Sequence, residues 1–225
     1  MLAGDRLLAA KQRMLDQHLR VRGITDERVL AAMERVPREE FVPVPLRGHA
    51  YDDRALPVEF GQTISQPYTV AFMAQAARLH AHERVLEIGT GSGYGAAVLS
   101  QLACEVCSIE RWPDLYGSAT QRLERLGFRN VVTKLGDGSL GWPEQAPFDA
   151  IIATAAAEQM PQALRDQLAE GGRLIIPIGE PGAGQTMFRF TRRNGEWKEE
   201  RLGLFSFVPL VCQPSASELR ALRQC

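Results

Sequence analysis

The alternation of short apolar stretches with helical stretches after residue 84 is the feature that most limits the fold of this chain. Strands are expected over residues 84–88, 105–110, 130–135, 148–154 and 173–178, and helices over residues 94–103, 113–126 and 161–169. Repeated β-α-β units require right-handed crossovers and build a parallel sheet covered by helices. The sequence therefore predicts an α/β protein with a Rossmann-like, doubly wound, mostly parallel sheet.

Both ends of the chain depart from this alternation. Asn194-Gly195 separates two strand-like segments and is a strong signal for a two-residue hairpin, so the sheet should finish with antiparallel strands. Near the N-terminus, helices are expected over residues 5–22 and 26–35, with Thr25 as a plausible N-cap of the second. Pro67 is expected to start a further helix, which would follow an N-terminal helical extension.

Composition excludes several broad classes of protein. Hydrophobic residues make up 45% of the chain and charged residues 24%, which are ordinary values for a globular protein. The formal net charge of −1 gives no large basic surface for nucleic acid. Apolar runs are too short for a membrane span, and charged residues interrupt any signal-peptide core near the N-terminus. A cytoplasmic protein that binds neither nucleic acid nor a membrane is expected.

Cys104 and Cys107 form a C-x-x-C pattern that is typical of redox or zinc sites. They flank a stretch that reads as a strand, and residues three apart on a strand point to opposite faces. The sequence supplies no second cysteine pair and no histidine cluster at ligand spacing to complete a metal site. Buried, unreactive thiols and no metal site are therefore expected.

The first candidate site is the glycine-rich turn after the strand at residues 84–88. Open parallel sheets bind ligands beyond the carboxyl ends of their strands, and this turn reads EIGTGSG from Glu87 to Gly93. A dinucleotide site needs G-x-G-x-x-G, whereas the third glycine comes one residue early here. The Glu87 carboxylate, two residues before Gly89, is unfavourable beside a pyrophosphate and suits a ligand that carries positive charge.

Two further strand ends complete a candidate ligand site. Glu110 closes its strand about 20 residues after Gly89, the spacing at which an acidic side chain reaches ribose hydroxyls. Asp137 and Gly138 follow the next strand in a G-D-G triplet, where an adenine edge would lie. Together the three strand ends outline a pocket for a nucleoside without a phosphate cradle, and the predicted cofactor is S-adenosylmethionine.

The motifs also carry a resemblance to a known family. VLEIGTGSGYGAAVLS, followed by SIER and GDG, resembles the class I S-adenosylmethionine methyltransferases. GQTISQP, the AAAEQMP stretch and FVPLV near the C-terminus are more specific, and they resemble the protein-L-isoaspartate O-methyltransferases. The similarity runs from Leu15 to Val211, which is nearly the whole chain.

This resemblance implies a protein-repair enzyme that methylates the α-carboxylate of L-isoaspartyl residues, with S-adenosylhomocysteine as product and isoaspartyl-containing proteins as partners. It also implies a single domain over residues 1–225, with an N-terminal cleft-forming extension (1–66) and a cofactor-binding core (67–225), and a monomer is expected. Ser65 is the expected catalytic residue. The expected cofactor-binding residues are Glu87, Gly89, Thr90, Gly91, Ser92, Glu110, Asp137 and Gly138. The expected substrate cleft contains Thr63, Ile64, Val208, Pro209 and Leu210, the last three on a strand over residues 207–211.

The expected chemistry needs no general base. A carboxylate with a pKa near ~4 is already ionised at neutral pH, so Ser65 is expected to orient it by donating a hydrogen bond. Three alternatives stay open: a methyltransferase for a small molecule or RNA, a nicotinamide oxidoreductase, and a non-catalytic cofactor-binding module. Whether residues 51–66 close over the cofactor is also left open.

Overall fold

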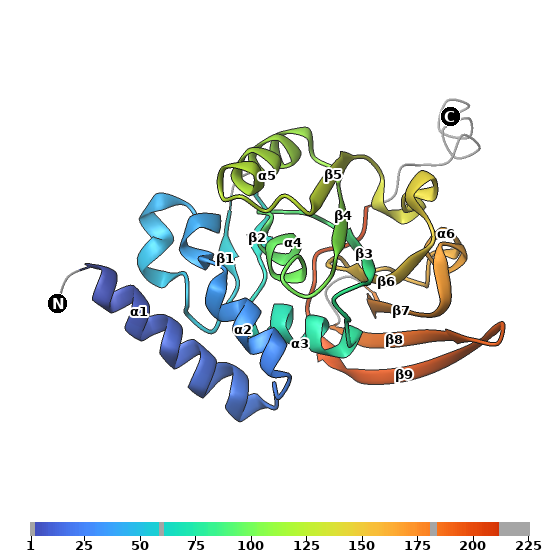
Figure 1. The fold of residues 1–225 in the computed structure, drawn as a ribbon, viewed down its shortest axis with the longest axis horizontal. Coiled ribbons are helices and arrows are strands. Elements are labelled where there is room, and N and C mark those ends of the chain that lie inside the picture. Colours follow the sequence, from blue (N-terminus) through green and yellow to red (C-terminus); the bar gives the residue numbers. More distant parts are fainter. Residues whose placement is uncertain (1–2, 59–60, 181–183, 212–225) are drawn as a thin grey trace.

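A seven-stranded mixed sheet forms the centre of the computed structural model, which describes residues 3–58, 61–180 and 184–211 (Figure 1). The strand order is β5-β4-β3-β6-β7-β8-β9. The strands are β3 (Arg84–Ile88), β4 (Glu105–Glu110), β5 (Val131–Leu135), β6 (Phe148–Ala153), β7 (Leu168–Ile178), β8 (Gln185–Arg193) and β9 (Glu196–Phe205). Strands β3 to β7 pair in parallel, and β8 pairs antiparallel with β7 and β9. The predicted mostly parallel sheet with antiparallel C-terminal strands is confirmed.

The β8–β9 hairpin has the predicted two-residue loop. Arg193 pairs with Glu196, which leaves Asn194 and Gly195 as the connection. Both loop residues have positive φ, at 53° and 75°, as a hairpin turn that matches the twist of its strands requires.

Both faces of the central strands β3, β4, β6 and β7 are buried, because neighbouring residues on them alternate between two hydrophobic clusters. Val85, Val106, Ala150 and Ile175 belong to the first cluster. Leu86, Cys107, Ile151 and Leu174 belong to the second. The first cluster also contains side chains of the N-terminal helices, and the second contains Leu164 of the α6 helix (Gln162–Asp166).

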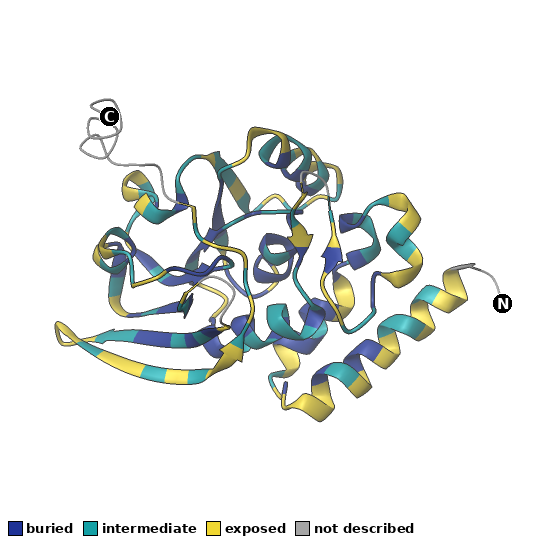
Figure 2. Ribbon diagram, turned by 180° about the vertical axis from the view of Figure 1, so that it is seen from behind, coloured by how far each residue is buried: buried dark blue, intermediate teal, exposed yellow. Residues whose placement is uncertain are grey.

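Helices and a small sheet surround this core (Figures 1 and 2). The α-helices are α1 (Ala3–Arg13), α2 (Glu27–Arg35), α3 (Pro67–Ala77), α4 (Tyr94–Leu99), α5 (Pro113–Arg125) and α6 (Gln162–Asp166). Strands β1 (Leu56–Pro57) and β2 (Thr63–Ile64) form a separate antiparallel pair just before α3. Within the described ranges, no helix has the length and apolarity to cross a membrane.

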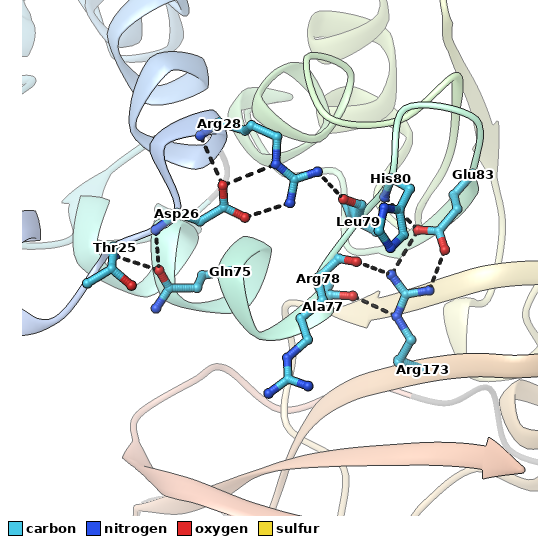
Figure 3. Close-up of polar contacts among 10 residues, drawn as sticks. All are labelled: Thr25, Asp26, Arg28, Gln75, Ala77, Arg78, Leu79, His80, Glu83 and Arg173. Atoms are coloured by element: carbon cyan, nitrogen blue, oxygen red, sulfur yellow. Dashed lines mark hydrogen bonds and ion pairs between the residues drawn. The ribbon is translucent and has the colours of Figure 1, made fainter.

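Polar contacts attach the N-terminal segment to the core (Figure 3). The Gln75 side chain on α3 accepts hydrogen bonds from the backbone N–H groups of Thr25 and Asp26, at 2.7 and 2.9 Å. Arg28 donates to the Leu79 carbonyl at 2.7 Å. The N-cap of α2 is Asp26, which accepts from the Arg28 backbone N–H, so the prediction of Thr25 was wrong. Thr25 instead uses its backbone N–H to bind Gln75.

Two segments near the C-terminus differ from their predicted conformations. Residues 168–169 were predicted as the end of a helix, but β7 begins at Leu168, which pairs with Phe148. The Gly171-Gly172 pair therefore lies within a strand and does not end a helix. Residues 207–211 were predicted as a strand, but they form a single bridge, between Pro209 and Ala156. Proline has no N–H with which to continue a ladder of hydrogen bonds.

Smaller differences concern helix ends and one cysteine. The first predicted helix is α-helical only to Arg13, and it continues as a π-helix (Met14–Leu19) and a 3-10 helix (Arg20–Arg22). The predicted helix at residues 94–103 ends at Leu99. Cys107 is buried as expected, but Cys104 is exposed because it precedes β4 instead of lying within it.

Candidate active site

A cavity of about 970 Å³ opens at the C-terminal ends of β3 and β4. Among the predicted site residues, those that line the cavity are Thr63, Ile64, Ser65, Glu87, Gly89, Thr90, Gly91, Ser92, Glu110, Gly138, Val208, Pro209 and Leu210. The structure therefore brings the expected cofactor residues and the expected acceptor residues to one site. Asp137 is the predicted residue that does not line this cavity.

The glycine-rich turn forms the floor of the cavity between β3 and α4. The backbone N–H groups of Gly89 and Thr90 donate to the Ile109 carbonyl at 2.9 and 3.2 Å, which fixes the turn against β4. Gly89 and Gly91 have φ values of 95° and 54°, in the left-handed region that favours glycine. At these two positions the turn thus presents backbone, without side-chain bulk, to whatever occupies the cavity.

Glu110 is held rigidly at the end of β4. One carboxylate oxygen accepts from the Gly91 N–H at 2.8 Å, and the other accepts from Arg111 and Trp112 at 2.8 and 3.0 Å. The residue is 4% exposed and lines the cavity. Because each carboxylate oxygen has two lone pairs, the oxygen that accepts only from Gly91 can still accept a hydrogen bond from a ligand hydroxyl. Glu110 therefore also holds the glycine turn, a role that the sequence did not reveal.

Glu87 is a buried carboxylate that faces the cavity without a basic partner among the described residues. It is 1% exposed, and burial raises its pKa to about 8, although the Ser108 hydroxyl favours the ionised form by donating at 2.6 Å. The Ser108 hydroxyl lies 2.6 Å from that of Thr90 in the turn. Glu87 is therefore mostly protonated at neutral pH and is poised to ionise beside a cation.

Ser108 is a site residue that the sequence analysis missed. It lies directly across from Glu87 in the parallel register of β3 and β4. A serine within an otherwise apolar buried strand was the available signal, but only the register shows which side chain it contacts.

Asp137 has a local structural role. Its Oδ1 accepts from the backbone N–H and the hydroxyl of Ser139, at 2.9 and 2.7 Å, and caps the short helix Gly138–Leu140. The neighbouring Gly138 lines the cavity, where an added Cβ would lie 2.4 Å from Cγ2 of Ile88. At this strand end the cavity is therefore shaped by a glycine backbone.

Ser65 lies between β2 and α3, and with Thr63 and Ile64 it forms the part of the cavity lining that we call the acceptor wall. It is partly buried and lines the cavity, and its hydroxyl makes no hydrogen bond to any described residue. Its carbonyl accepts from the Arg38 guanidinium at 2.8 Å. The next residue, Gln66, donates to the Asp53 carboxylate at 2.8 Å, and Pro67 begins α3. The backbone is thus fixed while the hydroxyl stays available to a ligand.

An aromatic cluster forms part of the cavity lining and was not predicted from the sequence. Tyr68 and Phe72 of α3 pack against Phe205 at the end of β9, with ring centroids 6.5 and 4.9 Å away. The Arg22 guanidinium lies over the Tyr68 ring, 3.6 Å from its centroid. All four residues line the cavity. They come from three distant parts of the chain, so no local pattern could have linked them.

The family model, the relatives in sequence and the solved structures that match this chain all indicate the same family. Residues 9–215 match the family model described as protein-L-isoaspartate(D-aspartate) O-methyltransferase (PCMT). A protein-L-isoaspartate O-methyltransferase 2 of Marinobacter nauticus is 53% identical, over 92% of this chain and 95% of its own. A protein-L-isoaspartate O-methyltransferase of Parvibaculum lavamentivorans is 54% identical, over 86% of this chain and 88% of its own.

Solved structures agree with these matches. A protein-L-isoaspartate O-methyltransferase superposes with a TM-score of 0.80 at 30% identity, over 95% of this chain and 69% of that one. A Plasmodium falciparum protein named for the same family was solved in complex with S-adenosyl-L-homocysteine. It superposes with a TM-score of 0.76 at 28% identity, over 88% of this chain and 96% of its own.

Proposed function

The chain belongs to the protein-L-isoaspartate O-methyltransferase family, and we propose that its cavity at β3 and β4 holds both the cofactor and the methyl acceptor. The enzyme transfers a methyl group from S-adenosylmethionine to the α-carboxylate of L-isoaspartyl residues in damaged proteins and peptides, and S-adenosylhomocysteine is its product. One observation carries the proposal: Ser65 lines the same cavity as Glu87, Gly89 and Glu110.

The residues present fit S-adenosylmethionine, which supplies an electrophilic methyl group on a sulfonium. Glu110 would accept a hydrogen bond from a ribose hydroxyl, and Gly89 and Gly91 leave room for the ligand against their backbone. Glu87 offers a carboxylate to a positively charged part of the cofactor. Gly138 would lie on the adenine side. Direct contact by Asp137 stays a prediction, and its engagement with Ser139 favours Gly138 for this role.

Ser65 would bind and orient the acceptor. Its hydroxyl can donate to one oxygen of the isoaspartyl carboxylate, which would leave the other oxygen free to accept the methyl group as the bond from the methyl carbon to sulfur breaks. The acceptor is already ionised at neutral pH, so no residue must remove a proton. Orientation of two bound reactants can supply ~7–11 kcal/mol of the barrier in favourable cases. The Tyr68, Phe72 and Phe205 rings would limit water around the reacting groups.

The organisation of the chain around this site is also part of the proposal. We propose one methyltransferase domain over residues 1–225, because Met14 and Leu30 of the extension share a hydrophobic cluster with Val85 and Val106 of the sheet. A monomeric state, a cytoplasmic location and the absence of nucleic-acid or membrane partners stay predictions. Sedimentation equilibrium of the purified chain would measure the first of them.

The proposed function is tested by methyl transfer to two peptides that differ only in L-isoaspartyl versus L-aspartyl at one position. Base-labile label is expected on the isoaspartyl peptide and not on its partner. No label on either peptide, with cofactor binding intact, would contradict the acceptor class and leave the cofactor assignment standing.

Replacement of Ser65 by alanine is expected to lower turnover ten- to a hundredfold, because a hydrogen bond to a charged group is worth ~1.5–3 kcal/mol. Affinity for the cofactor should stay within about twofold, since Ser65 lies on the acceptor wall. Steady-state kinetics and calorimetry separate the two effects. Ser118→Ala, which removes a hydroxyl on α5 outside the cavity, is the control. Wild-type turnover in Ser65→Ala would show that the Ser65 hydroxyl does not orient the acceptor, and that Ser65 only connects β2 to α3.

Replacement of Glu110 by alanine is expected to weaken cofactor binding by ~1–3 kcal/mol, through loss of ribose contacts and of the anchor on the Gly91 N–H. Glu105→Ala, at the other end of β4, should leave the affinity unchanged. Glu110→Gln separates the ribose contact from the anchor on the Gly91 N–H, because glutamine has the size of glutamate but only one acceptor oxygen. Calorimetry that finds wild-type affinity in folded Glu110→Ala would remove the ribose assignment.

A further inference from the structure

Arg38 is a fully buried arginine directly behind Ser65. It begins a 3-10 helix (Arg38–Phe41) and is 0% exposed. Its Nε donates to the Ala50 carbonyl at 2.6 Å, and its Nη2 donates to the Ser65 carbonyl at 2.8 Å. The guanidinium is therefore attached to the backbone of the residue whose hydroxyl is proposed to bind the acceptor.

No carboxylate neutralises the Arg38 charge among the described residues. The Nη1 atom is buried without a hydrogen-bond partner, and the guanidinium lies over the Tyr94 ring, 4.7 Å from its centroid. Tyr94 is 1% exposed and lines the cavity. Burial lowers the pKa of Arg38, but an arginine side chain stays protonated in proteins. A positive charge therefore persists at this wall.

Unlike Arg38, three arginines that line the cavity each lie close to a carboxylate. Arg22 lies 3.0 Å from the Asp53 carboxylate, Arg54 lies 3.2 Å from that of Asp52, and Arg111 lies 4.0 Å from that of Asp137. All three line the cavity, whereas Arg38 lies behind it. Exposed paired charges are screened by water and salt, but a buried charge acts through a low dielectric and keeps its field.

A buried, unpaired charge lowers stability unless something offsets it, and such costs are found at functional sites. The acceptor proposed for this cavity is an anion. We propose that Arg38 is a positioning residue that holds the Ser65 backbone and gives the acceptor wall the positive potential that selects an ionised carboxylate. This inference rests on the proposed function, because it concerns the group that Ser65 is proposed to bind.

The test compares two peptides that carry the isoaspartyl α-carboxylate or a neutral α-carboxamide in its place. Calorimetry with S-adenosylhomocysteine present measures binding without turnover. Wild-type protein is expected to prefer the carboxylate by about tenfold or more, and Arg38→Met should remove most of that preference. Arg189→Met is the control, since Arg189 is also buried and donates to a backbone carbonyl, that of Ala76. Its charge is paired with the Glu200 carboxylate at 2.9 Å, and neither Ala76 nor Glu200 lines the cavity. This variant should keep the wild-type preference.

A folded Arg38→Met that keeps the wild-type preference for the carboxylate would overturn the proposal. Arg38 would then only hold the Ser65 backbone through its hydrogen bond to the carbonyl. A second measurement needs no variant. The preference of the wild type should persist between low and high salt, because a buried cation is poorly screened. A preference that collapses with salt would assign it to the exposed arginines. Wild-type protein with no preference for the carboxylate would contradict the proposed function itself.

Discussion

Replacement of Gly89 by alanine is expected to weaken cofactor binding by at least about a hundredfold, which is the largest single-site effect we expect. Gly89 has φ 95°, and a Cβ at this position would lie 2.4 Å from the Thr154 hydroxyl oxygen. Left-handed backbone costs a non-glycine residue ~1–3 kcal/mol where the surroundings enforce it. The Thr154 hydroxyl is held 2.9 Å from the Ile88 and Gly89 carbonyls, so it cannot turn away without losing these contacts.

A control variant and a rescue variant separate the strain of the left-handed backbone from the clash with the Thr154 hydroxyl. Gly127 has φ 80°, but a Cβ there would meet nothing within 4 Å, and Gly127 does not line the cavity. Gly127→Ala should therefore lower the melting temperature slightly and leave cofactor affinity unchanged. Adding Thr154→Ala to Gly89→Ala removes the clashing oxygen and should restore part of the affinity. Calorimetry that finds near wild-type affinity in Gly89→Ala alone would show that the turn does not contact the cofactor.

Local spacing was sufficient to predict that Gly89, Gly91 and Glu110 lie together at one cavity. A strand end, a glycine turn and an acidic residue about 20 positions later occur in fixed order along one β-α-β unit. The parallel sheet then brings these positions together whatever the rest of the chain does. The same reasoning predicted the hairpin at Asn194-Gly195, where the turn residues alone specify the connection.

The acceptor side depends on contacts that local patterns do not encode. Arg38 reaches Ser65 across 27 residues, and Arg22, Tyr68 and Phe205 meet only after three segments have packed. Burial of Arg38 was unexpected because arginine is usually exposed. The helix prediction at Leu168 was wrong for a related reason. The local pattern of residues 161–169 favours a helix, but Leu168 pairs with Phe148 in β6, which is distant in the sequence.

Replacement of Glu87 by glutamine is expected to stabilise the protein at alkaline pH, because the wild-type carboxylate resists ionisation. Burial raises the pKa of Glu87 from 4.5 to about 8. Between these values the unfolded state has lost its proton and the folded state has not, so the unfolded state is favoured as pH rises. The stability that Glu87 contributes is complete below pH 4.5 and is lost by the time the pH passes 8. At 1.36 kcal/mol for each pH unit, the loss is of order 3–5 kcal/mol.

Glutamine does not titrate and can keep the contact with Ser108, so its stability should lack this decline. Urea unfolding of both proteins at pH 5 and pH 8.5 measures the change, and groups common to the two cancel in the difference. A constant difference across this range would contradict the raised pKa.

The same carboxylate should make cofactor binding release a proton. A cation beside Glu87 favours the ionised form, so binding at pH 7 should expel the proton that the empty site holds. Calorimetry in two buffers with different ionisation enthalpies measures the number of protons released on binding. The side chain at position 87 is expected to release nearly one proton in the wild type and none in Glu87→Gln. Equal release by the two proteins would mean that Glu87 does not meet the charged part of the cofactor. Its burial would then serve the contact between β3 and β4, through Ser108, and not the ligand.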